Sequence, residues 1–322
     1  MPPPCVIGVD LGGTKLLAGT VDRELNVHHR AHRPAAGGDR SAVLDRVVDA
    51  VEEAIAAAPG DVLGVGFGIP SLIDRVRGVA VSTVHLPIAD VPFRDIMVER
   101  LGLPVVVDND ANVAMLAEHR FGAAASTDHA VLITIGTGIG SGIVVDGKLV
   151  RGAVGAAAEL GHMVIDLDGP PCQGNCPNRG CMEALVSGSA LGRAGLAAAA
   201  ADPRGALAAA VATGRLMTGA LVTELAHDGD PAATECLRAA GVALGVGLAN
   251  IVNIFNPEVV VIGGGVIAAG DLLLEPARAE MRARALSPSR DIARIVPARF
   301  GAESGMLGAA VLAYDEHDGI PT

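Results

Sequence analysis

The stretch CVIGVDLGGTKLLAGTV, residues 5–21, alternates apolar residues with small or polar ones on both sides of Gly12 and Gly13. This alternation is typical of strands, and a glycine pair between two such runs predicts a β-hairpin. The same plan returns at residues 129–146, where a strand, the glycine-dense run 136–142 and a short second strand follow one another. The chain thus contains two glycine-rich hairpins, each expected to open a separate α/β half.

Strand and helix patterns alternate through the rest of the chain, which predicts the α/β class. We expect further strands near residues 27–32, 62–67, 105–107, 259–262 and 295–297. We expect helices at 92–101, 111–120 and 305–314, and one that Ser41 caps and that ends at 59–60. The alanine-rich region 194–212 also has helical character. The uncharged run 239–257 contains several Gly and Asn residues, so a buried helix is favoured over a membrane span.

Composition narrows the possible functions. A chain of 322 residues is long enough for about two domains. The net charge is −12 and lysine occurs only at Lys15 and Lys148, which argues against a nucleic-acid or anionic-membrane surface. The first residues, MPPPCVIGVD, have no basic segment or long apolar segment of a secretory signal, so we expect a cytoplasmic protein.

The glycine turns are candidates for phosphate binding. Glycine lets backbone N–H groups approach phosphate oxygens without interference from a Cβ atom. Two such turns facing across a cleft suit a nucleoside triphosphate, although neither is a Walker loop or a G-x-G-x-x-G motif. The run 263–265 follows a strand and fits part of the dinucleotide pattern, but it lacks the later acid. It equally permits an adenine ring to lie against the backbone.

Acidic residues follow the strand 105–107. In open α/β sheets the carboxyl ends of strands line the ligand crevice, so Asp108 and Asp110 are candidates for chemistry. The alternative is that one of these two aspartates simply caps the helix at 111–120, a common position for Asp.

A cluster of cysteines lies near one histidine. His162 precedes Cys172, Cys176 and Cys181, and three thiolates with one imidazole are the ligands of a closed tetrahedral zinc site. The alternatives are buried free thiols or a disulfide with one cysteine left over, which the absence of a secretory signal disfavours. Glu159 and Glu183 bracket these ligands, and metal binding would draw both into one small volume. Otherwise they are solvated surface carboxylates.

In their order along the chain these motifs resemble the ROK family of sugar kinases and repressors, and within it the zinc-containing bacterial glucokinases. The motifs are Asp10-x-Gly12-Gly13-Thr14-Lys15, Gly66-x-Gly68-x-Pro70, Asp108-Asn109-Asp110-Ala111-Asn112, Gly136-Thr137-Gly138-x-Gly140-x-Gly142, Glu159-Leu160-Gly161-His162, Cys172-x3-Cys176-x4-Cys181-x-Glu183 and Gly263-Gly264-Gly265.

The resemblance implies an α/β, two-domain actin/hexokinase-like (ribonuclease H-like) fold with a cleft between the domains. The expected domains are residues 1–109, completed by the C-terminal helix 305–322, and residues 110–304 with a zinc knuckle at 162–181. It also implies a homodimer that phosphorylates a hexose, most of all glucose, at the 6-hydroxyl with ATP.

The resemblance assigns roles to individual residues. Asp110 is the expected general base, and Mg²⁺ is expected to accompany ATP with Asp10 nearby. The expected sugar contacts are Gly68, Asn109, Asp110, Glu159, His162 and Glu183. The expected ATP contacts are Asp10, Gly12, Gly13, Thr14, Lys15, Gly136, Thr137, Gly138, Gly140, Gly263, Gly264 and Gly265. A structural Zn²⁺ is expected on His162, Cys172, Cys176 and Cys181.

The chain departs from the family pattern at two places. Three residues separate Cys172 from Cys176, where the family usually has one, which bears on the choice of the first metal ligand. The sugar loop reads VHLP at 84–87, where relatives often have Asn, which leaves the preferred sugar open. An N-acetylhexosamine kinase or a fructokinase is therefore an alternative. A sugar-sensing repressor is disfavoured, since such proteins carry a winged helix-turn-helix ahead of the first hairpin and tend to lose the catalytic Asp. Cys5 and Cys236 fall outside the motifs and are expected to be small buried hydrophobes.

Overall fold

A computed structural model describes residues 3–83 and 86–320, so part of the expected sugar loop, residues 84 and 85, lies outside the described residues. The chain forms two compact units. Unit 1 comprises Met1–Asp128, Gly142–Ala158 and Arg299–Thr322. Unit 2 comprises His129–Ser141 and Glu159–Ala298.

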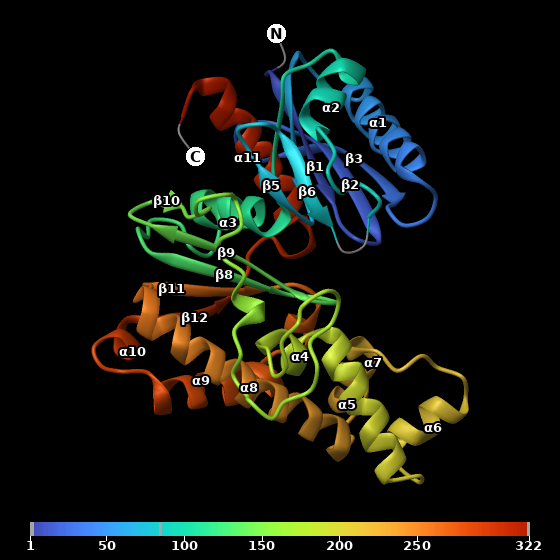
Figure 1. The fold of residues 1–322 in the computed structure, drawn as a ribbon, viewed down its shortest axis with the longest axis vertical. Helices are drawn as coiled ribbons and strands as arrows, with labels where there is room; N and C mark the ends of the chain where they lie inside the picture. Colours follow the sequence, from blue (N-terminus) through green and yellow to red (C-terminus); the bar gives the residue numbers. More distant parts are fainter. Residues whose placement is uncertain (1–2, 84–85, 321–322) are drawn as a thin grey trace. The chain divides into compact units, whose positions relative to one another are not determined.

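The sheet of unit 1 has the strand order β3-β2-β1-β4-β7 (Figure 1). These strands are β1 (Cys5–Leu11), β2 (Lys15–Val21), β3 (Val27–Pro34), β4 (Val62–Ile69) and β7 (Val105–Asn109). β1, β2 and β3 form antiparallel pairs, which confirms the first hairpin. β4 runs parallel to both β1 and β7, so the carboxyl ends of these three strands meet at one edge.

Helices cover both faces of this sheet (Figure 1). α1 (Arg40–Ala56) and α2 (Phe93–Leu101) pack on one face, and α3 (Asp110–Phe121) and α11 (Ser304–Asp318) on the other. The period-2 alternation of β1 produces this arrangement. Ile7, Val9 and Leu11 join the core beneath α1, whereas Val6 joins the core beneath α11. Asp10 therefore belongs to the α11 face of the strand.

Glycines allow α11 to approach its neighbours closely. A Cβ atom at Gly8 would lie 2.1 Å from the carbonyl oxygen of Met306, and one at Gly66 would lie 1.9 Å from that of Ala309. A Cβ atom at Gly308 would lie 1.7 Å from the carbonyl oxygen of Val113 on α3. Only a residue without a side chain fits at these contacts.

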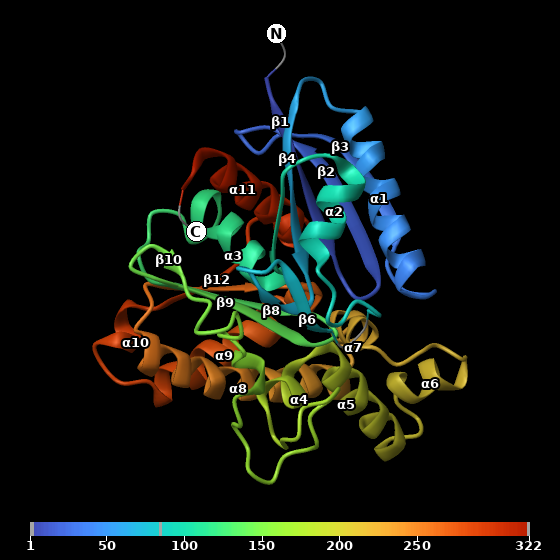
Figure 2. The same ribbon diagram turned by 45° about the horizontal axis from the view of Figure 1, so that its top comes forward.

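The second sheet has the order β10-β9-β8-β11-β12. Its strands are β8 (Ala130–Ile135), β9 (Ile139–Val145), β10 (Lys148–Leu149), β11 (Val259–Gly263) and β12 (Arg294–Pro297). β11 is parallel to β8 and to β12. The helices of unit 2 are α4 (Met182–Val186), α5 (Gly188–Ala201), α6 (Ala206–Ala212), α7 (Gly219–His227), α8 (Pro231–Phe255), α9 (Asp271–Arg284) and α10 (Ser289–Ile292). Figure 2 shows α8 and α9 along this sheet, whereas α6 lies away from it and packs against α5 and α7.

Among the described residues, one helix, α8, is long and apolar enough to span a membrane. However, 56% of its most apolar 18-residue stretch is buried inside the protein. Its Gly241 and Gly245 face α9, where added Cβ atoms would lie 2.5 Å from the Leu273 carbonyl oxygen and 2.6 Å from that of Ala277. The glycines that disfavour a membrane span therefore serve close helix packing, and α8 has the features of a core helix.

The α/β class expected from the sequence is confirmed, and α7 and α9 are among the helices that were not predicted. Asp39 rather than Ser41 caps α1, because its carboxylate accepts the N–H of Ala42. A two-stranded hairpin, β5 (Ser71–Asp74) and β6 (Val79–Thr83), was not predicted. α3 lies in unit 1, whereas the expected boundary at 109/110 would assign it to the second domain. The domain division drawn from the sequence stays a prediction.

Candidate active site

The register of unit 1 aligns several predicted site residues. Asp10 pairs with Gly68 across β1 and β4, and Gly68 pairs with Asp108 across β4 and β7. Asn109 and Asp110 follow at the junction of β7 and α3. The row thus lies at the carboxyl ends of parallel strands, where α/β sheets bind ligands. Gly68 is needed for packing, since a Cβ atom there would lie 2.5 Å from the side chain of Val113.

The start of α3 orients the proposed base. Asn109 is the N-cap, and its Oδ1 accepts the N–H groups of Ala111 and Asn112 at 2.9 and 3.1 Å. Asp110 is the first helical residue, and its Oδ1 accepts the N–H of Ala111 at 2.8 Å. The alternative that Asp108 or Asp110 caps this helix is therefore wrong, because the amide of Asn109 occupies the capping position.

Two of these carboxylates share one electrostatic environment. Burial raises the pKa of Asp110 above its ordinary value. Burial and, next, the negative charge of Asp110 raise the pKa of Asp10 to about 7. Desolvation and a like charge both disfavour the ionised form, so this pair attracts a proton or a cation. Carboxylate oxygens are ligands that suit Mg²⁺, and in this respect Asp10 fits its expected role.

Asp108 pairs with arginine side chains instead of facing Asp10 and Asp110 as a free carboxylate. It is 2% exposed, and its Oδ2 lies 2.7 Å from Nε of Arg151 and 3.9 Å from Nε of Arg75. Its Oδ1 accepts the N–H of Asn109 at 2.8 Å and Nδ2 of Asn112 at 3.2 Å. Asp108 thus ties the β7–α3 junction to two arginines. Neither arginine was predicted, because nothing in the local sequence marks either as a partner of Asp108.

The first glycine turn of unit 1 lies at the same strand ends. The N–H of Gly12 donates to the carbonyl of Lys15 at 2.8 Å, and the side chains of Thr14 and Lys15 are exposed. Gly305, in the first turn of α11, lies directly against Asp10, since a Cβ atom there would lie 2.6 Å from its carboxylate. Lys15 is thus a solvent-accessible cation on the strand that follows Asp10.

In unit 2 the second glycine turn and the later glycine run are neighbours. β8 and β11 are parallel, with Gly263 opposite Thr134. Gly264 has a φ of +83°, and a Cβ atom there would lie 2.4 Å from the carbonyl of Ile135. The turn at 136–138 and the run at 263–265 therefore leave the sheet side by side.

The turn at 136–139 is held by hydrogen bonds from two segments, the start of α5 and the loop that carries the cysteines. The N–H of Gly188 donates to the carbonyl of Gly136 at 2.7 Å. The carbonyl of Thr137 accepts from Nε2 of Gln173 at 3.0 Å and from Oγ of Ser189 at 2.9 Å. These bonds fix the orientation of two successive peptide groups. Gln173 and Ser189 were not among the predicted site residues.

Glu183 is buried, at 7% exposure, and not the solvated surface carboxylate of the alternative interpretation. Its Oε2 accepts the N–H of Ile139 at 2.7 Å, and its Oε1 lies 3.8 Å from Sγ of Cys172. Glu159, in contrast, is exposed, and its Oε2 lies 3.9 Å from Nε2 of His162. The two acids that bracket the cysteine cluster thus occupy different environments.

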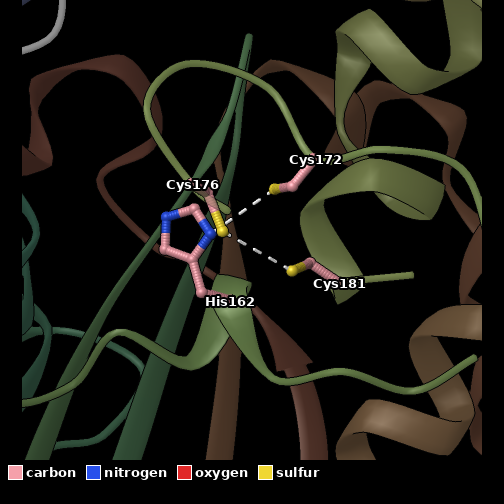
Figure 3. A group of neighbouring side chains, drawn as sticks. All are labelled: His162, Cys172, Cys176 and Cys181. Atoms are coloured by element: carbon pink, nitrogen blue, oxygen red, sulfur yellow. Dashed lines mark hydrogen bonds between the residues drawn. The ribbon is translucent and has the colours of Figure 1, made fainter. Parts of the chain in front are cut away.

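His162, Cys172, Cys176 and Cys181 converge (Figure 3), and their candidate ligand atoms all lie within 4.8 Å of one another. Nδ1 of His162 lies 3.5 Å from Sγ of Cys172, and the sulfur atoms of Cys176 and Cys181 are 3.9 Å apart. A tetrahedral zinc site with ordinary bond lengths has edges of about 3.5 Å for nitrogen to sulfur and about 3.8 Å for sulfur to sulfur. The cluster could therefore hold such an ion.

The chemistry of the thiols also fits a metal. Burial and the neighbouring Cys181 and Cys176 raise the pKa of Cys172 to about 12, and burial raises that of Cys181. Clustered thiols in this state do not ionise near neutral pH, whereas a bound divalent cation displaces their protons. All five cysteines are free, Cys5 is buried as expected, and Cys236 is only half-buried. The disulfide alternative is not what the structure shows.

The structure therefore gathers the predicted residues into two groups, each within one unit. Asp10, Gly12, Gly68, Asn109 and Asp110 lie at the strand ends of unit 1, with Asp108 withdrawn into its ion pair. The turn 136–140, the run 263–265 and the His/Cys cluster with its two glutamates lie in unit 2.

Two α/β units with glycine turns and acids at the carboxyl ends of parallel strands define the class: this is the actin/hexokinase-like fold of sugar kinases. The chain matches the ROK family over residues 6–316 and belongs to that family.

Comparison with known proteins shows similarity to glucokinases and to a transcriptional regulator of the same family. The chain is 35% identical to the glucokinase of Streptomyces coelicolor over 313 residues, covering 96% of this chain and 97% of that protein. It is 36% identical, with a TM-score of 0.84, to a ROK family glucokinase from Streptomyces griseus solved with glucose and AMPPNP, covering 97% and 99% of the two chains. A ROK family transcriptional regulator, a homologue of the E. coli MLC protein, is 29% identical with a TM-score of 0.88. The match covers 99% of this chain and 80% of that regulator.

Proposed function

We propose that this protein is an ATP-dependent hexose kinase that phosphorylates the 6-hydroxyl of glucose. The observation that carries the proposal is the placement of Asp110, a carboxylate of raised pKa at the strand ends of unit 1, beside Asp10. Relatives at 35% and 36% identity over nearly the whole chain are glucokinases, and one of them was solved with glucose and an ATP analogue.

In this proposal Asp110 accepts the proton of the sugar 6-hydroxyl as that oxygen attacks the γ-phosphorus of ATP, the bond from this phosphorus to the β–γ bridging oxygen breaks, and ADP leaves. Phosphoryl transfer asks the protein mainly for in-line positioning and for neutralisation of phosphate charge. A single aspartate suffices because the hydroxyl loses its proton late, once the bond to phosphorus is forming. The hydrogen bond from the N–H of Ala111 fixes Oδ1 of this carboxylate.

The nucleotide contacts follow from the two glycine turns. The residues at 10–15 and 136–140 hold the phosphates, Lys15 contributes positive charge, and the run 263–265 meets the adenosine. Mg²⁺ accompanies ATP near Asp10 and neutralises phosphate charge. Backbone N–H groups in such turns bind anions because no side chain intervenes.

The sugar contacts proposed are Gly68, Asn109, Asp110, Glu159, His162 and Glu183. Zinc is the proposed occupant of the His162, Cys172, Cys176 and Cys181 cluster, with a structural role. Because Nδ1 of His162 faces the thiol of Cys172, Nε2 is the nitrogen left for Glu159 or a sugar hydroxyl. Binding of one imidazole nitrogen by metal fixes the tautomer that the other presents. We further propose a homodimer in the cytoplasm.

A panel of sugars tests the substrate. ADP release should be fastest with glucose, compared with mannose, fructose, N-acetylglucosamine and N-acetylmannosamine. Preference for an N-acetylhexosamine or fructose would support the kinase activity but show that glucose is not the preferred substrate. The alternative function is a sugar-sensing regulator, which the TM-score of 0.88 to a ROK regulator favours. Sugar binding without turnover on any sugar would select it.

Asp110→Ala tests the mechanism. Removal of the base should lower kcat by roughly a thousandfold or more while hexose binding is largely kept. Asp61→Ala, at an exposed position of the same unit, serves as the control and should leave kcat unchanged. Turnover of the Asp110 variant within tenfold of the wild type would show that another group takes the proton.

A further inference from the structure

The loop that carries the cysteines reaches the second glycine turn directly. Gln173, next to Cys172, donates from Nε2 to the carbonyl of Thr137 at 3.0 Å. Glu183, two residues after Cys181, accepts the N–H of Ile139 at 2.7 Å. A Cβ atom at Gly138 would lie 2.5 Å from Oε2 of Glu183 and 3.4 Å from Nε2 of Gln173. The cysteine loop and its flanking acid thus enclose residues 137–139 from one side.

These contacts determine where the amides of the turn point. In a planar trans peptide the C=O and the next N–H point in opposite directions. The carbonyls of Gly136 and Thr137 are held by Gly188, Gln173 and Ser189, so the N–H groups of Thr137 and Gly138 are directed to the opposite side. The N–H of Ile139 is different, because Glu183 accepts it. The N–H groups of Thr137 and Gly138 are therefore oriented to bind an anion, whereas the N–H of Ile139 already donates to Glu183.

Glu183 also connects the turn with the cluster of thiols. Its Oε2 accepts the Ile139 N–H, and its Oε1 lies 3.8 Å from Sγ of Cys172. The side chain is 7% exposed, so a change in the position of Cys172 is transmitted to the turn rather than absorbed by solvent. A metal that fixes Cys172 and Cys181 thereby fixes residues on both sides of this carboxylate.

We infer that Gln173 and Glu183 are positioning residues for nucleotide binding, through which the metal-binding knuckle holds the phosphate-binding turn 136–139 in shape. This inference rests on the proposed function and gives Glu183 a role in addition to its proposed sugar contact. Loss of either bond lets the peptide groups of the turn rotate. ATP binding then weakens more than hexose binding.

Gln173→Glu tests the first bond. The substitution keeps the shape of the side chain and removes the donor to Thr137. Asn175→Asp makes the same change of charge at an exposed residue of the same loop and is the matched control. In the zinc-loaded protein, Gln173→Glu should raise the dissociation constant of AMPPNP, measured by calorimetry, about tenfold. The control should stay within about twofold, as should the KM for hexose in both variants. Zinc content should be unchanged.

Glu183→Ala and Glu183→Gln test the second bond. Alanine removes the acceptor of the Ile139 N–H and should raise the KM for ATP by about tenfold or more, whereas glutamine keeps a carbonyl acceptor and should restore most of the affinity. Faster amide exchange across residues 136–139 should accompany the alanine change. A rise in the hexose KM alone would overturn the positioning role and leave only the sugar contact.

Measurements on the wild-type protein distinguish failure of the proposed function from failure of the positioning role. If the wild-type protein phosphorylates no sugar and does not bind AMPPNP, the proposed function fails whatever the variants do. If the wild type is active and Gln173→Glu behaves as Asn175→Asp does, only the positioning role is wrong. Loss of zinc from Gln173→Glu, with both substrates affected equally, would also overturn it, since the side chain would then only stabilise the knuckle.

Discussion

At the scale of single residues, the acids of unit 1 give the clearest pH prediction. Burial, followed by the charge of Asp110, raises the pKa of Asp10 to about 7 from an ordinary value of 3.8. The folded protein therefore holds this proton more tightly than the unfolded chain does. The stabilisation is fully present below about pH 4 and is lost as the pH rises through about 7.

Asp10→Asn removes this dependence. In the ligand-free protein at pH 8, the variant should exceed the wild type in free energy of unfolding by roughly 4 kcal/mol. The difference should disappear near pH 4. Urea unfolding at a series of pH values measures it, with Asp61→Asn as an exposed control. A difference that is constant with pH would show that Asp10 ionises normally in the folded protein.

The same residues show how far sequence reasoning reaches. A motif after a buried strand was enough to place Asp108, Asn109 and Asp110 at a ligand-binding edge. It did not decide which of them caps α3, because Asp and Asn are both good caps and only the backbone geometry selects Asn109. The ion pair of Asp108 with Arg151 could not be predicted from the sequence, since Arg151 is distant along the chain and becomes a neighbour only in the folded unit.

At the scale of elements, the contact of α3 with α11 depends on one glycine. A Cβ atom at Gly308 would lie 1.7 Å from the backbone carbonyl of Val113, which cannot move without shifting α3. Gly308→Ala should therefore lower the free energy of unfolding by about 1–3 kcal/mol, the usual cost of overpacking, despite the better helix propensity of alanine. Gly265→Ala, where a Cβ atom has nothing within 4 Å, is the control for thermal unfolding. Equal stability of the two variants would mean that the helices separate at little cost.

Elements with strong periodicity were predictable and weak ones were not. The alternation in β1 and β2 and the apolar spacing of α1 predicted these elements because each buries one face. The hairpin β5–β6 was missed, since its strands are short and the charged turn Arg75-Val76-Arg77-Gly78 carries no apolar pattern. Arg75, which lies near Asp108, comes from this same hairpin turn.

At the scale of the whole molecule, the chain passes between the two units several times, at 128/129, 141/142, 158/159 and 298/299. The division expected from the sequence has two crossings, one at 109/110 after β7 and one at 304/305, where the C-terminal helix returns to the first domain. Sequence patterns mark the ends of elements, but they do not show that α3 packs with α11 from the far end of the chain, since that contact depends on tertiary packing. The repeated hairpin plan was the signal that did indicate two halves.

The last of these crossings returns to unit 1 beside Glu118 of α3. This side chain is fully buried, and its Oε2 accepts the N–H groups of Ala123 and Arg299 at 2.8 and 3.1 Å. Its Oε1 accepts the N–H of Phe300 at 3.0 Å and lies 3.4 Å from Oγ of Ser304, whose hydroxyl donates to the carbonyl of Gly301 at 2.9 Å. Both oxygens of a carboxylate are acceptors, so Glu118 satisfies the three N–H donors of Ala123, Arg299 and Phe300.

Glu118→Gln should be strongly destabilising although it preserves shape. The amide NH₂ group must face at least one N–H donor in either orientation, which leaves a buried N–H group unpaired and removes charge-assisted bonds. We expect a loss of about 3 kcal/mol in the free energy of unfolding, measured with urea, against no change for Glu316→Gln at an exposed position of α11. Because the donors lie where residues 299–304 lead into α11, proteolysis should cut this segment faster in the variant. A Glu118→Gln protein with wild-type stability and wild-type protease resistance would show that α3 and its packing alone hold the returning chain in place.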